Sequence, residues 1–406
     1  MKKFVILMII PSLIGCQNLS RAPKAHNKAF HIHKVTYLDS LKINPWQYIQ
    51  KTQLVDIPDN ARIINERNKL VKNKRSFENL LERSEPYIHY FITQLQLRKM
   101  PIELLLIPLI ESACNPLAIS YSKAAGLWQI APITARNYGL VFNSWYDGRL
   151  DLIASTDIAL NHLQYLNKNF DGDWLLTLAA YNAGEGRISK AIQSNIEHHL
   201  PTNYWALQLS KETMQYVPKF LAMIDIIRHN ERYDILLPTT NFDNTLIKIN
   251  LGKAASLDTI SKYSHIPYKD LITYNAAYLD KKLNGPYHLL VPRKKLNVLH
   301  QKLLKNNYTQ VKIVDLTSDL NNKRTHIVPS LLKTNRKYST ITDKDLQFYT
   351  RSHLKYKKIN YMIKSGDSLS TIAKAHRVTT KELMDWNNIK NANSLKIGSK
   401  LIIHIK

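Results

Sequence analysis

Residues 101–140 read PIELLLIPLIESACNPLAISYSKAAGLWQIAPITARNYGL. The run at 104–110 is apolar and interrupted only by Pro108, and it ends on a single carboxylate, Glu111. Burial disfavours the ionised form of a carboxyl group and raises its pKa toward neutrality, which is the condition a general acid needs near pH 7. Glu111 is therefore the candidate catalytic residue. The alternative is a solvated or hydrogen-bonded side chain where a helix meets a loop.

Further motifs follow this carboxylate along the chain. They are NPLAIS, GLWQI and AYNAG, which supply the candidate substrate-binding residues Ser120, Gln129, Tyr181 and Asn182. Taken in this order after Glu111, the motifs resemble those of the lytic transglycosylases with a goose-lysozyme-like catalytic domain. The resemblance extends through DGRLD at 147–151, FDGDWLL at 170–176 and ETMQYVPK at 212–219. It implies a mainly α, lysozyme-like catalytic domain over residues 100–232.

The resemblance also implies a reaction. An enzyme of this family cleaves the β-1,4 bond between N-acetylmuramic acid and N-acetylglucosamine in peptidoglycan and leaves a 1,6-anhydromuramic acid end. Glu111 would protonate the bridging oxygen and then take the proton from the muramic C6 hydroxyl, so no water is consumed. Ser120 would form a hydrogen bond near the acetamido group or Glu111, and Gln129 would contact the sugar. Tyr181 would orient Glu111, whereas Asn182 would help to hold the shape of the cleft.

Other functions stay open at this point. Glycosidases commonly use two carboxylates, and a lysozyme-like hydrolase would need a second one, for which Asp147 and Asp151 are the nearby candidates. Structural roles are the alternative: Asp151 could cap the following helix, and Asp147 or Asp151 could pair with Arg149. A non-catalytic peptidoglycan-binding scaffold is a further possibility. No cluster has the spacing of metal ligands, so neither a metal nor another cofactor is expected.

The N-terminal residues 1–15 have the charged start and short apolar core of a secretory signal. They end in LIG before Cys16, which resembles a bacterial lipobox and implies cleavage and acylation at that cysteine. Because Gln17 follows, we expect a lipid anchor in the outer membrane that faces the periplasm. An ordinary cleaved signal is the alternative. The polar, basic residues 16–44 would then form a tether, and the remaining cysteine, Cys114, is expected to be a small buried side chain.

The C-terminal residues 359–405 alternate as strand, helix, helix and strand, and they resemble a LysM domain, a small α+β fold that binds N-acetylglucosamine-containing chains. The resemblance implies a sugar groove lined by Gly366, Asp367, Ser368, Leu369, Leu395, Lys396 and Ile397. For Leu369 and Ile397 a place in the core is an equal alternative.

The remaining segments are assigned by pattern. Residues 45–99 show helical spacing and are expected to pack on the catalytic core. Residues 245–295 repeat the strand, helix, helix, strand order in a weaker form and are interpreted as a degenerate LysM-like unit. Residues 296–358 are rich in Lys and Asn and are expected to be a linker with some local structure.

Length and charge agree with an envelope protein of several domains. The chain has 406 residues, which suits two or three domains, and 57 Lys and Arg against 31 Asp and Glu give a net charge of +26. Such an excess favours a polyanion or a negatively charged surface. No nucleic-acid-binding module is recognisable, so the cell wall and an anionic membrane are the expected partners. A biased base composition of the genome would produce the same excess without any partner.

Overall fold

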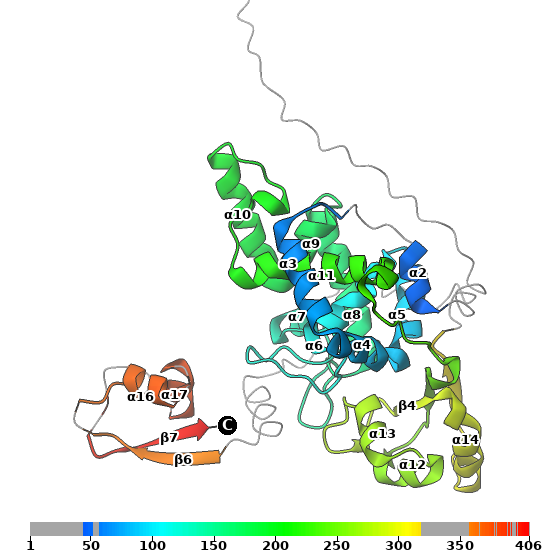
Figure 1. Cartoon of the computed structure of the whole chain (residues 1–406). Coiled ribbons are helices and arrows are strands. Elements are labelled where there is room, and N and C mark those ends of the chain that lie inside the picture. The colour runs from blue at the N-terminus through cyan, green and yellow to red at the C-terminus, as the bar shows by residue number, and fades with distance from the viewer. Residues whose placement is uncertain are drawn as a thin grey trace, which may run out of the picture. The chain divides into compact units, whose positions relative to one another are not determined.

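The computed structural model describes residues 44–51, 57–317 and 357–405, except positions 365, 377, 379, 388, 390, 392–394 and 396 in the last segment (Figure 1). The expected signal peptide, the cysteine expected to be acylated (Cys16) and nearly all of the expected tether lie outside the described residues. The predicted fold class is confirmed, because the catalytic region is mainly helical and lysozyme-like and a small α+β module follows it.

The N-terminal helices belong to the same core as the catalytic region. They are α2 (Pro45–Lys51), α3 (Ala61–Lys72), α4 (Lys74–Arg83) and α5 (Glu85–Leu97). Trp46 and Phe91 are fully buried in that core, and α3 packs along the later helix α11 (Lys211–Arg228). Burying such large aromatic side chains is a major source of folding free energy. The described helices of 45–99 therefore fold together with the catalytic region around one hydrophobic core.

The run that ends in Glu111 forms two short helical elements. Residues Ile102–Leu106 form the 3₁₀ helix η1, and Ile107–Ser112 form helix α6. Pro108 stands in the first turn of α6, where its missing N–H has no helical partner to lose. Ala113 and Cys114 then adopt left-handed backbone angles, with φ of 52° and 54°, which end the helix. Glu111 consequently lies in the last turn of α6.

Longer helices complete the catalytic body. They are α7 (Pro132–Asn137), α8 (Leu152–Asn169), α9 (Trp174–Ala183), α10 (Glu185–Glu197) and α11, with the 3₁₀ helices η2 (Tyr204–Ala206), η3 (Asn230–Tyr233) and η4 (Phe242–Asn244). Asp151 caps α8 by accepting hydrogen bonds from the backbone N–H groups of Ile153 and Ala154, as the sequence predicted. Asp173 caps α9 in the same way, and such caps satisfy N–H groups that the helix itself leaves unpaired.

The middle unit is larger than the sequence suggested. Its elements are β1 (Leu246–Asn250), β2 (Ala255–Ser256), α12 (Leu257–Ser264), α13 (Tyr268–Tyr274), β3 (Lys282–Leu283), β4 (His288–Pro292), η5 (Arg293–Lys295), α14 (Leu296–Lys305) and β5 (Lys312–Asp315). An antiparallel sheet has the strand order β4-β1-β5. Within the expected linker, residues 296–317 have more than local structure, because α14 buries Leu299 and Leu303, one helical turn apart, and β5 pairs with β1. The rest of that expected linker, 318–356, lies outside the described residues.

Several polar contacts between described residues join the middle unit to the catalytic body. The backbone N–H of Asp147 donates to the carbonyl of Ala277 over 2.9 Å, and that of Leu279 donates to the carbonyl of Trp145 over 2.9 Å. His288 Nε2 lies 2.5 Å from a carboxylate oxygen of Asp151, and both side chains are buried. The two parts are thus joined by buried polar contacts as well as by the chain.

The C-terminal module has its own small core. It consists of β6 (Lys357–Met362), α16 (Leu369–Ala375), α17 (Thr380–Trp386) and β7 (Lys400–Ile405), and the two strands pair antiparallel with Tyr361 opposite Leu401. Ser368 begins α16 with a capping box that also uses Thr371. Leu369 is 1% exposed and belongs to the core, the alternative that the sequence left open for it.

Candidate active site

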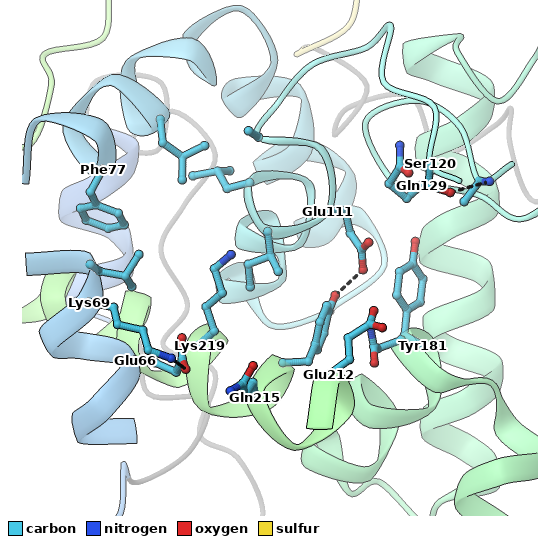
Figure 2. Close-up of a pocket in the computed structure, with 18 of the residues that line it drawn as sticks. Glu66, Lys69, Phe77, Glu111, Ser120, Gln129, Tyr181, Glu212, Gln215 and Lys219 are labelled. Atoms are coloured by element: carbon cyan, nitrogen blue, oxygen red, sulfur yellow. Dashed lines mark hydrogen bonds and ion pairs between the residues drawn. The ribbon is translucent and has the colours of Figure 1, made fainter. Parts of the chain in front are cut away.

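A cavity of about 900 Å³ opens in front of Glu111. Figure 2 shows Ser120 and Gln129 on one side of Glu111, and Phe77 and Lys69 on the other side with Lys219 between. The predicted residues Glu111, Ser120, Gln129, Tyr181 and Asn182 all line this cavity, with α3 and α4 forming the opposite wall. The fold thus gathers residues from distant motifs around one space, which is the usual form of a ligand site.

Glu111 is the titratable centre of the cavity. Its side chain is partly buried, and Tyr216 Oη donates a hydrogen bond of 2.7 Å to its Oε1 atom. Burial raises the pKa of Glu111 to about 7, although the Tyr216 bond and the charge of Lys219 oppose the rise, and the neighbouring Glu212 adds to it. The carboxyl group can therefore carry a proton near neutral pH and release it during a reaction.

The tyrosine that forms a hydrogen bond to Glu111 is Tyr216, whereas the sequence analysis expected Tyr181 to orient Glu111. The Tyr181 hydroxyl donates to the backbone carbonyl of Trp128 over 2.8 Å, so it makes no hydrogen bond to Glu111. Burial, together with the nearby charge of Glu111, raises the pKa of both phenols well above the ordinary value. Both hydroxyl groups therefore keep their protons, and the one that supports Glu111 is that of Tyr216.

Tyr216 belongs to the ETMQYVPK motif on α11, which the sequence analysis used only as part of the resemblance and to which it assigned no site residue. The same helix also brings Glu212, Gln215 and Lys219 to the cavity. Their spacing of three or four residues places them on one helical face, a signal that could have pointed to them once the helix was known to face Glu111.

Asn182 is held in a structural network. Its Nδ2 atom donates to Glu212 Oε1 over 3.2 Å, and its Oδ1 accepts a bond of 2.9 Å from the hydroxyl of Thr213. These contacts join the end of α9 to the first turn of α11. Asn182 therefore fixes the relative position of the helices that carry Tyr181 and Tyr216.

The loop 118–130 presents Ser120 and Gln129 to the cavity. The backbone N–H of Ala124 donates to Ser120 Oγ over 3.0 Å, and Gln129 Nε2 donates to the carbonyls of Ala118 and Gly126. Gln129 has a φ of 48°, a strained value for this residue type. Such strain is tolerated where surrounding contacts enforce it, often at functional sites.

Arg149 anchors this loop from behind. Its Nη1 donates to the carbonyl of Lys123 over 2.8 Å, and its Nε and Nη2 atoms donate to the carboxylate of Asp147. Both charged side chains are fully buried. Gly126 passes so close that a Cβ atom there would lie 2.0 Å from the carbonyl oxygen of Arg149, so only glycine fits.

The carboxylates considered for a hydrolase have structural roles. Asp147 pairs with Arg149, while Asp151 caps α8 and pairs with His288, and neither residue lines the cavity. The cavity instead contains Glu66 and Glu212, which the sequence did not single out. Glu66 forms an ion pair of 2.6 Å with Lys69, and Glu212 accepts from Asn182.

In the C-terminal module, several residues that were expected to line the sugar groove have structural roles. Asp367 accepts hydrogen bonds from the Tyr361 hydroxyl and from the backbone N–H of Lys364. The other expected groove residues divide between exposed positions (Gly366 and Ile397), a helix cap (Ser368), the core or its margin (Leu369 and Leu395) and a position outside the described residues (Lys396).

Within the described residues, no group of three or more His, Cys, Asp or Glu side chains is arranged to hold a metal ion. Cys114 is buried, as predicted, and burial raises the pKa of its thiol, which is unfavourable for a nucleophile.

None of the helices that the structure describes is both long enough and apolar enough to cross a membrane.

Comparisons with known proteins define the class first. The family model of the transglycosylase SLT domain matches residues 90–199, and the LysM model matches residues 361–404. Glu111 therefore lies in a region that matches the transglycosylase SLT domain, and a region that matches the LysM domain follows it. The chain is also 38% identical over 82 residues to the soluble lytic murein transglycosylase of Escherichia coli K12, covering 19% of this chain and 13% of that protein.

A full-length relative narrows the class. The chain is 36% identical over 447 aligned residues to the membrane-bound lytic murein transglycosylase D of Escherichia coli K12, covering all of this chain and 98% of that protein. The chain belongs to this family, which confirms the resemblance drawn from the motifs. The crystal structure of the 70 kDa soluble lytic transglycosylase from Escherichia coli aligns with 46% of this chain and 32% of its own, at 22% identity and a TM-score of 0.30.

Proposed function

We propose that this protein is a peptidoglycan lytic transglycosylase that cleaves the β-1,4 bond between N-acetylmuramic acid and N-acetylglucosamine. The products carry a 1,6-anhydromuramic acid end, and the activity serves cell-wall remodelling. Membership of the lytic murein transglycosylase D family supports the substrate class. The observation that carries the chemistry is Glu111, a carboxyl group with a pKa raised to about 7, facing a cavity and held by Tyr216.

In the first step, protonated Glu111 acts as a general acid. Tyr216 donates to Oε1, so the acidic proton is delivered from Oε2 to the oxygen that bridges the sugars. The C1–O bond of the muramic acid breaks as this proton arrives, and the N-acetylglucosamine side leaves as an alcohol. The positive charge that develops at C1 is stabilised by the carbonyl oxygen of the substrate's own acetamido group, so no carboxylate of the enzyme has to bond to C1.

In the second step, Glu111 acts as a general base. Its carboxylate is stabilised by the hydrogen bond from Tyr216 and by the positive charge of Lys219. It removes the proton of the muramic C6 hydroxyl, O6 attacks C1, and the acetamido oxygen is released. The 1,6-anhydro ring closes and Glu111 is protonated again, which restores the starting state without consuming water.

The neighbouring residues bind and shape the substrate. Ser120 and Gln129 project from the loop 118–130 and would contact the sugar at the muramic acid position. Tyr181 closes the space beside Glu111, and its donation to the Trp128 carbonyl joins α9 to that loop. Asn182 would preserve the cleft by linking α9 to α11.

The LysM domain would hold the enzyme on glycan chains that contain N-acetylglucosamine, through the groove around Gly366 and Ile397. The sequence before Cys16 supports acylation at that residue and attachment to the outer membrane on the periplasmic side of the cell envelope. The name of the full-length relative, which describes a membrane-bound protein, agrees with this proposal. Labelling by radioactive palmitate that depends on Cys16 would test the anchor.

The function is tested by mass spectrometry of the soluble products from purified peptidoglycan, with wild-type protein lacking the acyl anchor beside Glu111→Gln. Muropeptides one water lighter than hydrolysis products, absent with the variant, are the expected result. Full-mass reducing ends would indicate that water attacks C1 and would direct attention to Glu212. If both proteins bind the glycan and neither releases products, the result would support the alternative of a non-catalytic peptidoglycan-binding scaffold.

A further inference from the structure

The loop 118–130, which forms one side of the active site, lies between two hydrophobic cores. Trp128 of this loop is buried in the core of the catalytic body. Ala125 is fully buried in a second core whose members come mostly from the middle unit, and Ile119 packs against that core as well. Because protein interiors are close-packed, the position of the loop depends on both cores.

A short antiparallel bridge joins the catalytic body to the middle unit at Tyr146 and Tyr278. Beside this bridge, the backbone N–H of Asp147 donates to the carbonyl of Ala277 over 2.9 Å. The two tyrosine rings lie 5.5 Å apart between their centroids, and Tyr278 is buried. Its hydroxyl donates to the carbonyl of His288 over 2.6 Å, which fixes Tyr278 within the middle unit. The middle unit therefore sets the position of Asp147.

Asp147 transmits this constraint to the loop. Its carboxylate accepts from the guanidinium group of Arg149, and Arg149 Nη1 donates to the carbonyl of Lys123 over 2.8 Å. Both charged side chains are fully buried, so separating them would leave a buried charge without its partner. The backbone of Gly126 also packs tightly against that of Arg149. A shift of Asp147 would consequently move the loop.

We propose that the middle unit is a positioning element of the active site and that Tyr278 is its positioning residue. None of the described residues of the middle unit lines the cavity, so the unit acts through the loop. The proposal rests on the proposed function, in which Ser120 and Gln129 of this loop contact the sugar. Glu111 lies on α6, whose buried apolar residues belong to the core of the catalytic body. Loss of the support would therefore misplace the loop and leave the acid in place.

The test uses the full chain without its acyl anchor and perturbs the joint from both sides. Tyr278→Leu removes the ring and the hydroxyl, whereas Tyr278→Phe keeps the ring and serves as the conservative variant. Ile119→Ala weakens the contact from the loop side and leaves the middle unit unchanged, so the test does not depend on the folding of Tyr278→Leu. Leu303→Ala is the matched control, because Leu303 is fully buried in the same core but belongs to α14, which packs on α12.

Two readouts are measured at a temperature below the onset of unfolding of every variant. The first is kcat and KM for the release of 1,6-anhydro ends from soluble glycan, as a function of pH. The second is hydrogen exchange of the loop, followed by mass spectrometry. The backbone N–H groups of Ser120, Gly126 and Ile130 are hydrogen-bonded to carbonyls of the same loop, so their exchange reports its local order.

We expect Tyr278→Leu to lower kcat/KM about tenfold or more, because a small misplacement of substrate-positioning groups has effects of this size. The alkaline midpoint of the pH profile, which reports Glu111, should stay at the wild-type value. Ile119→Ala should lower kcat/KM in the same direction, and the loop should exchange faster in both variants. Tyr278→Phe should keep most of the activity. Leu303→Ala should lower the melting temperature but retain wild-type kcat/KM and loop exchange.

Wild-type kcat/KM in both Tyr278→Leu and Ile119→Ala would overturn the proposal, even if the loop exchanged faster. An equal loss of activity in Leu303→Ala would overturn it too, since the general stability of the middle unit would then be the cause. If wild type releases no anhydro ends, the proposed function fails. Hydrogen exchange then judges the inference, which is supported by a loop that loses protection in Tyr278→Leu and Ile119→Ala but not in Leu303→Ala, and overturned by equal protection in all variants.

Discussion

Replacing Tyr216 by Phe tests how the site tunes Glu111. The substitution removes one oxygen atom and with it the 2.7 Å hydrogen bond to Glu111 Oε1. This bond lowers the pKa of Glu111, whereas burial raises it. Without the bond, the carboxyl group should keep its proton to a higher pH. The ring of Tyr216 is buried and is kept by the substitution, so the packing of α11 should survive.

The size of the change follows from the energy of the bond. A hydrogen bond to a charged group contributes about 1.5–3 kcal/mol, and about 1.36 kcal/mol corresponds to one pH unit. The general acid works only while it is protonated, so kcat/KM falls as the pH rises through the pKa of Glu111 in the free enzyme. In Tyr216→Phe this fall should occur about one pH unit higher. The maximal kcat should decrease about tenfold, because the ionised Glu111 formed in the first step loses its donor.

The assay is the pH dependence of kcat/KM for the release of 1,6-anhydro ends from soluble glycan. Tyr181→Phe is the matched control, since the Tyr181 hydroxyl also lies in the cavity but donates to the Trp128 carbonyl. Its alkaline midpoint should stay within a few tenths of the wild-type value. An unmoved or lowered midpoint in Tyr216→Phe, or the same upward move in both variants, would refute the role assigned to the Tyr216 bond.

Three other expectations concern chemistry and stability. Glu111→Gln should lose activity by about 10²–10⁴-fold or more, because the residue serves both proton transfers, while its melting temperature, measured by calorimetry, should not fall. Arg149→Met should reduce the free energy of unfolding in urea by about 3–5 kcal/mol, since Asp147 would stay buried without its partner; a loss below about 1 kcal/mol would contradict this. Burial raises the pKa of Asp151, but His288 and two backbone N–H groups outweigh it and lower the pKa to about 2. The ionised carboxylate therefore adds about 2 kcal/mol to the free energy of unfolding above about pH 4, and this contribution disappears as the pH falls toward 2. In an acid-unfolding titration, His288→Gln should lose less stability than wild type over this pH range.

The local part of the fold could be predicted from the sequence. Asp151 was expected as a helix cap, and the side chain performs that role because the cap depends on residues only two and three positions away. Glu111 was singled out because an apolar run leads directly to it. Alternation of residue types also predicted the strands and helices of the LysM domain. These features depend on neighbours along the chain, where spacing alone gives the geometry.

Residues 296–317, for which the sequence indicated only a linker with some local structure, show the limit of such reasoning. Lys- and Asn-rich composition concealed α14, whose buried Leu299 and Leu303 need the middle unit to cover them. Strand β5 likewise exists through its pairing with β1, more than sixty residues earlier along the chain, with Ile313 opposite Ile249. A short polar segment becomes ordered when another part of the fold supplies its partners, and composition does not report that partner.

The sequence by itself determined the family, the order of the domains and the acid at the centre of the site, because each of these is carried by contiguous motifs. Only the tertiary structure decided which phenol supports that acid, since Tyr216 lies 105 residues after Glu111 and meets it through the packing of α11. It also showed that Asp147 and Asp151 have structural roles and do not line the cavity, whereas Arg83 does. Charges act through space, so the roles of ionisable side chains depend on neighbours that the order of residues does not reveal.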